Sequence, residues 1–146
     1  MKTTLQFFAI VFCAILFSGC GKAGDTPAVS DEQKLANLLS GNGNKVWKLN
    51  KVLVNGVDQT LTMDQKKYTK TYTINISVKT GGSFTNSGGD YGEWFVTGSR
   101  AFSEFITTIG GSQYQVDYII RDVSESLLDI QYNKNGQTAR EIYNGY

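Results

Sequence analysis

Residues 69–79 read TKTYTINISVK, and from Thr71 onward polar and apolar side chains alternate at every position. Successive side chains of an extended strand point to opposite faces, so this alternation predicts a β-strand with one apolar and one polar face. The glycine pair at 81–82 is typical of a turn. We therefore expect a strand whose buried face carries Tyr72, Ile74, Ile76 and Val78.

Seven further segments have strand character, and turn-forming residues separate them. They are residues 45–56, which end in the turn pair Asn55-Gly56, and then 83–87, 92–97, 102–109, 113–121, 126–132 and 137–143. Most connections are too short for a crossover, so neighbouring strands should pair antiparallel. Eight such strands in an up-and-down meander close into a barrel, which leaves no exposed sheet edge. Two packed sheets are the alternative fold, although the Cys-Trp-Cys pattern of immunoglobulin sandwiches is absent from the sequence.

Two helical segments are expected beside these strands. Residues 30–41 begin with a Ser-x-x-Gln capping box and end in a glycine, which predicts a short N-terminal helix. The one long connection, residues 57–69, repeats the capping-box spacing at Thr62 and Gln65. We expect a short helix there, lying over one end of the barrel.

This order of elements resembles the lipocalin family, in particular the small lipocalin-like lipoproteins of Gram-negative bacteria. The likeness covers about residues 33–146: a short helix, a Trp early in the first strand, a long first connection and an eight-stranded meander. In lipocalins the early Trp, usually in a Gly-x-Trp motif, closes the base of the barrel; here the nearest glycine, Gly43, is four residues before Trp47. A late arginine often lies over that Trp, so the resemblance implies that Arg140 touches Trp47, a favourable guanidinium–indole contact.

The first nineteen residues have the character of a signal peptide. Lys2 is followed by an apolar run of eleven residues, 7–17, which is shorter than the roughly 20 needed to span a bilayer. The segment FSGC at 17–20 resembles the lipobox of bacterial lipoproteins. That resemblance implies that Cys20 receives diacylglycerol and becomes the first residue of the mature chain. Several acyl chains would then hold the protein on a membrane durably.

The mature chain is expected to comprise a lipidated flexible tether at 20–30 and one barrel domain at 31–146. Gly21 follows the acylated cysteine where an aspartate retains many lipoproteins at the inner membrane, so the resemblance favours the outer membrane of a Gram-negative bacterium. Without Lys2, 13 of the 14 basic residues remain against 13 acidic ones, so no basic surface for nucleic acid is expected. Histidine is absent and Cys13 lies in the signal peptide, so the usual ligands of zinc and copper are missing as well.

No catalytic constellation stands out in the sequence. Histidine, the usual general base at neutral pH, is absent. Carboxylate pairs such as those of glycosidases would have to come from Asp90 with Glu93 or from Asp117 with Glu104. Alternation places Asp117 on the outward face of its strand, where it is solvated. We therefore expect a non-enzymatic protein without a cofactor or metal.

The inward strand faces predict a binding cavity or a filled core. Aromatic and aliphatic side chains with several phenolic hydroxyls suit an amphipathic, largely apolar ligand, with residues 58–70 as a lid over the barrel mouth. The alternative is a filled barrel that acts as a protein-interaction module, a lipoprotein subunit or an inhibitor, through an exposed apolar patch near Trp94, Phe95 and Ile106. The expected ligand-lining residues are Tyr72, Ile74, Ile76, Val78, Tyr114, Val116, Tyr118, Ile120, Leu128, Ile130 and Tyr132.

Overall fold

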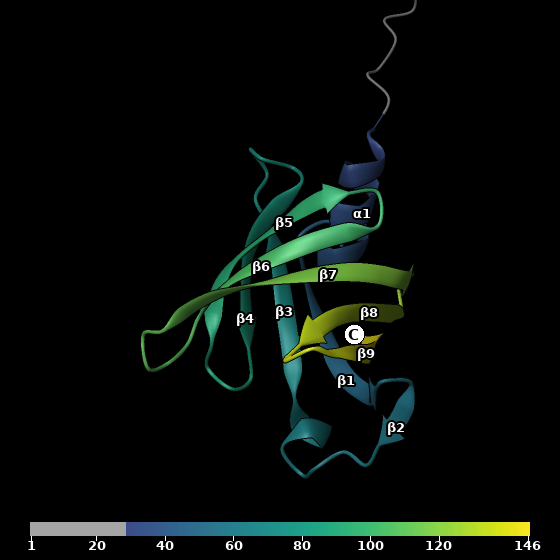
Figure 1. Cartoon of the computed structure of the whole chain (residues 1–146). Coiled ribbons are helices and arrows are strands. Elements are labelled where there is room, and N and C mark those ends of the chain that lie inside the picture. The colour runs from purple at the N-terminus through teal and green to yellow at the C-terminus, as the bar shows by residue number, and fades with distance from the viewer. Residues whose placement is uncertain (1–28) are drawn as a thin grey trace, which may run out of the picture.

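The computed structural model describes residues 29–146, so the predicted signal peptide, Cys20 and most of the predicted tether lie outside the described residues (Figure 1). None of the helices within 29–146 combines the length and the apolar character that crossing a membrane requires. In chain order the elements are α1 (Asp31–Ser40), β1 (Asn44–Val54), β2 (Val57–Gln59), the 3-10 helix η1 (Gln65–Lys67), β3 (Thr69–Ile74), β4 (Gly81–Asn86), β5 (Tyr91–Gly98), β6 (Ala101–Thr107), β7 (Gln113–Val123), β8 (Leu127–Lys134) and β9 (Gln137–Gly145).

Eight strands form a closed antiparallel barrel, as the alternation predicts. β1 and β3 to β9 pair in sequence order, and β1 also pairs with β9, which closes the sheet on itself. β2 is a three-residue extension that pairs only with the end of β1. Closure leaves the long strands without an unpaired edge, the arrangement that protects a β protein from edge-to-edge association.

β1 closes the barrel because it reaches both neighbours. Its residues 44–48 pair with β3, while residues 47–54 pair with β9 around a register shift between Leu49 and Lys51. Glycines on β4 and β5 allow these strands to pack closely against their neighbours β3 and β6. A Cβ atom at Gly82 would lie 1.9 Å from the carbonyl oxygen of Thr73, and one at Gly92 equally close to that of Phe105. Only a residue without a side chain allows the strands to approach so closely.

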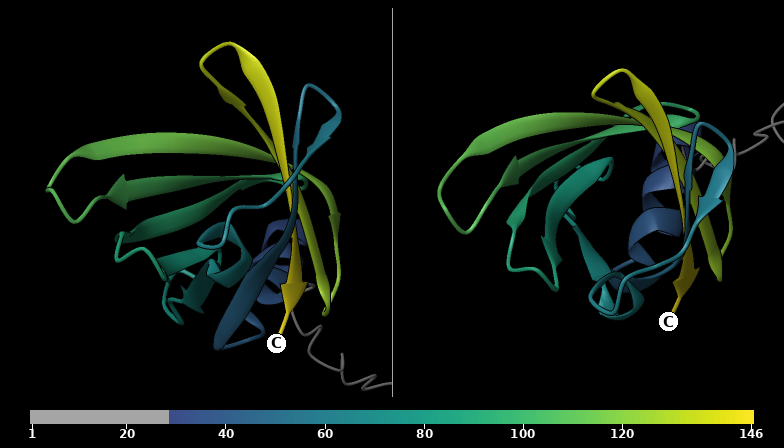
Figure 2. Two further views of the ribbon diagram at one scale, coloured as in Figure 1. Left: turned by 90° about the horizontal axis from the view of Figure 1, so that it is seen from below. Right: turned by 60° about the horizontal axis from the view of Figure 1, so that its bottom comes forward.

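Helix α1 closes one end of the barrel (Figure 2), where it packs against β1, β3 and β5. Ser30 caps it by accepting a hydrogen bond from the Gln33 N–H at 3.2 Å, and Gly41 ends it in the left-handed conformation at φ 60°. Its buried side chains Leu35, Ala36 and Leu39 join the core of the barrel. The end next to α1 is called the closed end below.

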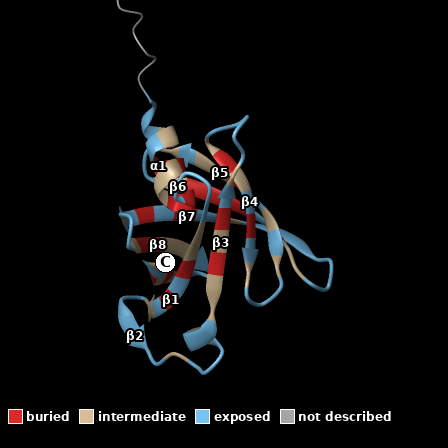
Figure 3. Ribbon diagram, turned by 180° about the vertical axis from the view of Figure 1, so that it is seen from behind, coloured by how far each residue is buried: buried red, intermediate tan, exposed pale blue. Residues whose placement is uncertain are grey.

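The core lies inside the barrel and is rich in aromatic rings. The ring of Tyr72 occupies its centre, with centroid distances of 5.6 Å to Trp94, 5.9 Å to Phe102 and 6.3 Å to Phe84. Figure 3 shows the buried residues along the barrel strands, whereas β2 and the loop after it are exposed. The buried apolar strand residues are Trp47, Leu49, Tyr72, Phe84, Trp94, Phe102, Ile106, Tyr118, Ile120, Leu128, Ile130, Ala139 and Tyr143.

The expectation that Ile76 and Val78 line the barrel is wrong. β3 ends at Ile74, and both side chains lie in the following turn, 83% and 47% exposed. Asn75 forms this turn, because its side chain accepts a hydrogen bond from the Ser77 N–H and its carbonyl oxygen accepts from Lys79 N–H at 2.8 Å. Asparagine side chains commonly compete with strand pairing in this way. The apolar alternation therefore continues in the sequence beyond the point where the strand stops.

Candidate functional site: the open cup of the barrel

The end of the barrel opposite α1 contains a cavity of about 460 Å³. We call this cavity the cup. Four tyrosines, two apolar residues and a group of charged and amide side chains surround it. The lining residues are Tyr68, Lys70, Asn86, Asp90, Glu104, Ile106, Tyr114, Gln115, Val116, Tyr118, Tyr132, Asn133, Lys134, Asn135 and Glu141.

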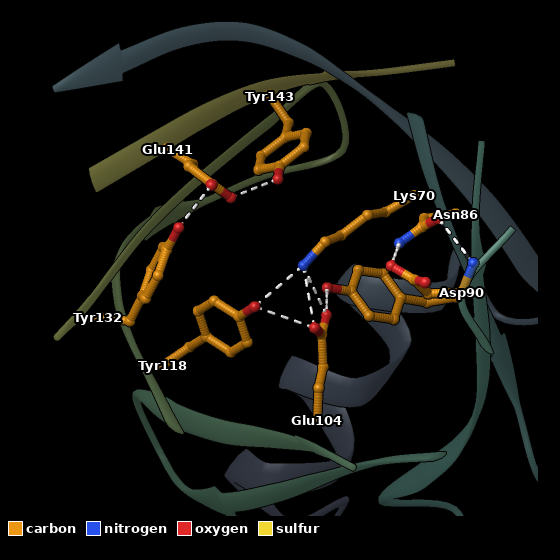
Figure 4. A network of polar contacts seen from close by, with 9 residues as sticks. Lys70, Asn86, Asp90, Glu104, Tyr118, Tyr132, Glu141 and Tyr143 are labelled. Atoms are coloured by element: carbon orange, nitrogen blue, oxygen red, sulfur yellow. Dashed lines mark hydrogen bonds and ion pairs between the residues drawn. The ribbon is translucent and has the colours of Figure 1, made fainter. Parts of the chain in front are cut away.

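The floor of the cup is an ion pair inside the barrel (Figure 4). The Lys70 ammonium on β3 donates to both carboxylate oxygens of Glu104 on β6, at 3.0 and 2.9 Å, and to the Tyr118 hydroxyl at 3.0 Å. Tyr118 in turn donates to Glu104 at 2.9 Å, and the hydroxyl of Tyr72 below donates to the other oxygen of the same carboxylate. Glu104 is fully buried and Lys70 is 4% exposed.

The network keeps Lys70 and its two phenol neighbours protonated. Burial is the largest single influence and would lower the pKa of Lys70, but Glu104 and three nearby tyrosines together outweigh it and leave that pKa raised. Burial raises the pKa values of Tyr72 and Tyr118, so both phenols stay protonated and act as donors. Within residues 29–146 every buried side-chain nitrogen and oxygen has a hydrogen-bond partner. A buried ion pair is tolerated when its remaining hydrogen-bonding capacity is filled in this way.

A second carboxylate lies on the wall of the cup. Glu141 on β9 is half-buried and accepts a hydrogen bond from the Tyr132 hydroxyl at 2.8 Å and another from the Tyr143 hydroxyl. On the other side of the floor, Asp90 and Asn86 bond each other, side chain to side chain and side chain to backbone, at 3.1 Å. Figure 4 shows the Lys70–Glu104 pair between these two groups.

Tyr68 completes the wall at the end of the long connection. Burial, aided by the charges of Glu141 and Glu104, raises its pKa to about 12 against the opposing effect of Lys70. The capping box predicted just before it is present, since Thr62 and Gln65 exchange backbone-to-side-chain hydrogen bonds at 2.9 and 3.2 Å. The expectation that the lid extends from residue 58 to residue 70 is wrong at its last residue. Lys70 lies in the floor of the cup, where it forms an ion pair with Glu104.

Most of the expected lining residues point into the barrel, but they divide into two groups. Tyr114, Val116, Tyr118 and Tyr132 line the cup, with Tyr114 half-exposed at its rim. The others fill the barrel beneath the cup as part of its packed core or against it: Tyr72, Ile74, Ile120, Leu128 and Ile130. Side chains therefore pack the lower part of the barrel, and the cup lies toward its open end.

The expected contact between Trp47 and Arg140 is wrong. Trp47 pairs with Gly145 on β9, whereas Arg140 pairs with Leu53, farther along β1. Arg140 instead forms an ion pair with Asp129 on β8. The Trp47 indole donates to the Leu39 carbonyl oxygen at 2.8 Å, and the cation over its ring is Lys45 at 4.4 Å.

The carboxylate pairs considered for catalysis do not form. Asp117 lies outside the barrel, where it accepts a hydrogen bond from Ser103, while Glu104 is inside. Asp90 lines the cup, while Glu93 is exposed and borders a groove to which Asp90 does not contribute. Within residues 29–146 no group of acidic, cysteine or histidine residues is arranged to hold a metal ion.

The expectation of an exposed apolar patch near Trp94, Phe95 and Ile106 is wrong for two of these residues. Trp94 and Ile106 are buried inside the barrel, because their strand positions face the core. Phe95 lies on the outer surface, in edge-to-face contact with Phe105 at 6.2 Å.

The alternation of side chains did not reveal the residues that give the cup its charge: Lys70, Glu104 as a partner of Lys70, and Glu141. A signal for two of them was present, because Lys70 alternates with Tyr72 and Glu104 lies between Phe102 and Ile106 at inward positions. A charged residue at an inward position requires a partner.

Comparisons with protein-family models, with curated proteins and with solved structures find no significant match. The fold and the geometry of the cup therefore carry the functional argument.

Proposed function

We propose that this protein is a lipid-anchored, lipocalin-like binding protein that holds one small amphipathic molecule in the cup. The observation that carries the proposal is the cavity of about 460 Å³ at the open end, above a floor whose hydrogen bonds are complete. Its size falls within the roughly 300–1,000 Å³ typical of small-molecule sites. A rigid floor favours binding, because little side-chain order has to be created when a ligand enters.

The lining supports an apolar molecule that also carries polar groups. The tyrosine rings, Ile106 and Val116 offer apolar contact, and burying roughly 200 Å² of ligand contributes about 5 kcal/mol. The phenolic hydroxyls, Asn86 and Glu141 offer hydrogen bonds on the wall. The sequence favours a largely apolar ligand, and the cup adds the requirement for at least one polar group.

Binding of the neutral fluorophore N-phenyl-1-naphthylamine tests the proposal. We expect its emission to rise on binding and to saturate at one site per chain. Val116→Trp places a large ring in the cup and should abolish the signal, whereas Ile119→Trp adds a ring on the outer face of the same strand and should not. A signal that survives Val116→Trp in a folded variant, or no signal from the wild-type protein, would contradict a binding cup.

The lipid anchor is part of the same proposal and rests on the lipobox-like segment that ends at Cys20. We expect the mature protein to carry acyl chains such as palmitate and to fractionate with the outer membrane. Cys20→Ala should remove both the added mass and the membrane association, which mass spectrometry and cell fractionation measure. An unmodified, membrane-free wild-type protein would exclude the anchor but not the binding cup.

An interaction module is the second candidate, favoured by an aromatic stripe on the outer face of β5 and β6. Tyr91 and Phe105 in this stripe are 55% and 47% exposed, and Phe95 packs against Phe105. A photoreactive phenylalanine at Phe105 should give one discrete adduct in cells if this stripe binds a protein. The same probe at Ile119, also outside the barrel, is the control.

A further inference from the structure

The charges within the cup indicate which polar group its ligand carries. The Lys70–Glu104 pair contributes no net charge, and its bonds are complete. The Lys70 ammonium uses its three donors on Glu104 and Tyr118, and each oxygen of Glu104 accepts from Lys70 and from one phenol. The pair therefore supports the floor and is not available to an anionic ligand.

Glu141 has a different environment. Its two oxygens each accept one phenol hydrogen bond, from Tyr132 and Tyr143, and these donors bring no positive charge. None of the ion pairs within residues 29–146 involves Glu141 or Asp90. A carboxylate oxygen has room for two hydrogen bonds, so Glu141 keeps acceptor sites free on the wall of the cup.

The rings around Glu141 add to the preference for positive charge. Tyr68 and Tyr132 line the cup beside it, and burial raises their pKa values so that both phenols are neutral at physiological pH. Neutral aromatic faces attract cations. The cup already contains one such contact, since Lys70 Nζ lies 4.8 Å from the centroid of the Tyr118 ring.

Across the whole lining, two positive residues, Lys70 and Lys134, face three negative ones, Asp90, Glu104 and Glu141. Because Glu104 neutralises Lys70 and Lys134 is exposed, the half-buried charges without an ion-pair partner are both negative. A ligand carboxylate or phosphate would have to enter beside them, whereas a ligand cation would be attracted.

We propose that the ligand of the cup is an amine: a small apolar or aromatic body with a protonated ammonium group that pairs with Glu141 among the rings of Tyr68 and Tyr132. This inference rests on the proposed binding function and specifies the chemical class of its ligand.

Three probes of one shape, applied to the purified protein in isothermal titration calorimetry, test this class: 2-phenylethylamine, 2-phenylethanol and 3-phenylpropanoate. We expect the amine to bind about tenfold more tightly than the alcohol, and the carboxylate to bind more weakly than both. Because the attraction involves charge, added salt should weaken binding of the amine and leave binding of the alcohol unchanged.

Glu141→Gln assigns the effect to its residue. It should lower affinity for the amine about tenfold and leave affinity for the alcohol unchanged. Glu125→Gln makes the same change of charge at an exposed turn of the closed end and should alter neither. If Glu141→Gln does not fold, Asp90→Asn provides the second variant, with a smaller loss expected because Asp90 lies on the far side of the floor.

The outcomes separate the two proposals. Equal binding of amine and alcohol, or tightest binding of the carboxylate, would overturn the inference and leave the binding cup intact. Amine binding that survives both Glu141→Gln and Asp90→Asn would overturn it as well. Failure of all three probes together with N-phenyl-1-naphthylamine would overturn the proposed function itself.

Discussion

The closed and open ends of the barrel are built from the same strands, yet they bury their interiors in different ways. At the closed end, Leu39 of α1 and Trp47 of β1 pack into an aromatic core, and the indole N–H is satisfied by a helix carbonyl. At the open end, Lys70 and Glu104 form a buried ion pair, and Glu141 accepts from two phenols. Apolar volume fills one end, while a polar network supports a cavity at the other.

This difference shows where a closed barrel can hold a ligand. Large buried rings from several strands pack the interior of the barrel at the closed end, and α1 adds further apolar contacts there. Polar side chains at the open end form hydrogen bonds with one another. They therefore build a stable floor without filling the space above it. The comparison predicts that substitutions at the two ends have different consequences.

The largest effect is expected from breaking the buried ion pair. Glu104→Leu leaves the Lys70 ammonium buried without its carboxylate, and we expect a loss of about 3–5 kcal/mol in the free energy of unfolding, measured with urea. The double variant Lys70→Met with Glu104→Leu removes both charges and should regain most of that loss. A double variant as unstable as the single one would show that the pair is not the source of the effect.

At the closed end, Leu39→Ala should remove fully buried apolar contacts between α1 and the core. The expected cost is about 2–5 kcal/mol in the free energy of unfolding. The neighbouring Leu38→Ala makes the same change at a position that is only partly buried, so it should cost clearly less. Equal losses for the two variants would contradict the packing of α1 onto the barrel.

The phenols of the open end should make stability depend on high pH. The pKa of Tyr68 is raised from 10.0 to about 12 in the folded protein, so the folded state holds its proton longer than the unfolded state. This contribution to stability is fully present below pH 10 and is lost as the pH rises to about 12. Tyr68→Phe should therefore flatten the fall of the urea midpoint across this range, whereas Tyr146→Phe, at an exposed position, should not.

The smallest effect is expected for the cation that lies over Trp47 at the closed end. Lys45→Met removes an ammonium 4.4 Å from the indole centroid, with an expected loss of about 0.5–1 kcal/mol in the free energy of unfolding. Lys48→Met, at an exposed position of the same strand, is the control. Lys45→Arg should retain most of the stability, because a guanidinium also binds to aromatic faces.

Much of the fold follows from the sequence because strand alternation and turns are local properties. The turn pairs Asn55-Gly56 and Asn135-Gly136 adopt the positive φ angles that such pairs favour, and strands begin and end close to them. The error at Ile76 and Val78 has a local cause too, since Asn75 ends the strand although the apolar alternation continues.

The site was less predictable, because it depends on which inward side chains meet across the barrel. Tyr114, Val116, Tyr118 and Tyr132 follow from alternation alone. Lys70 and Glu104 are 34 positions apart in the chain, and their contact depends on the register of every strand between them. Arg140 was misplaced for the same reason, since its register on β1 sets it beside Leu53 and not beside Trp47.

By itself, the sequence determined most of the strand segments, their order, the capped helix before them and the inward side chains of β7 and β8, because backbone conformation imposes the direction of each side chain locally. Only the tertiary structure decided that β1 meets β9, that α1 fills one end and that the charges gather at the other. Those outcomes depend on shear and side-chain volume summed around a closed sheet, which no single segment contains.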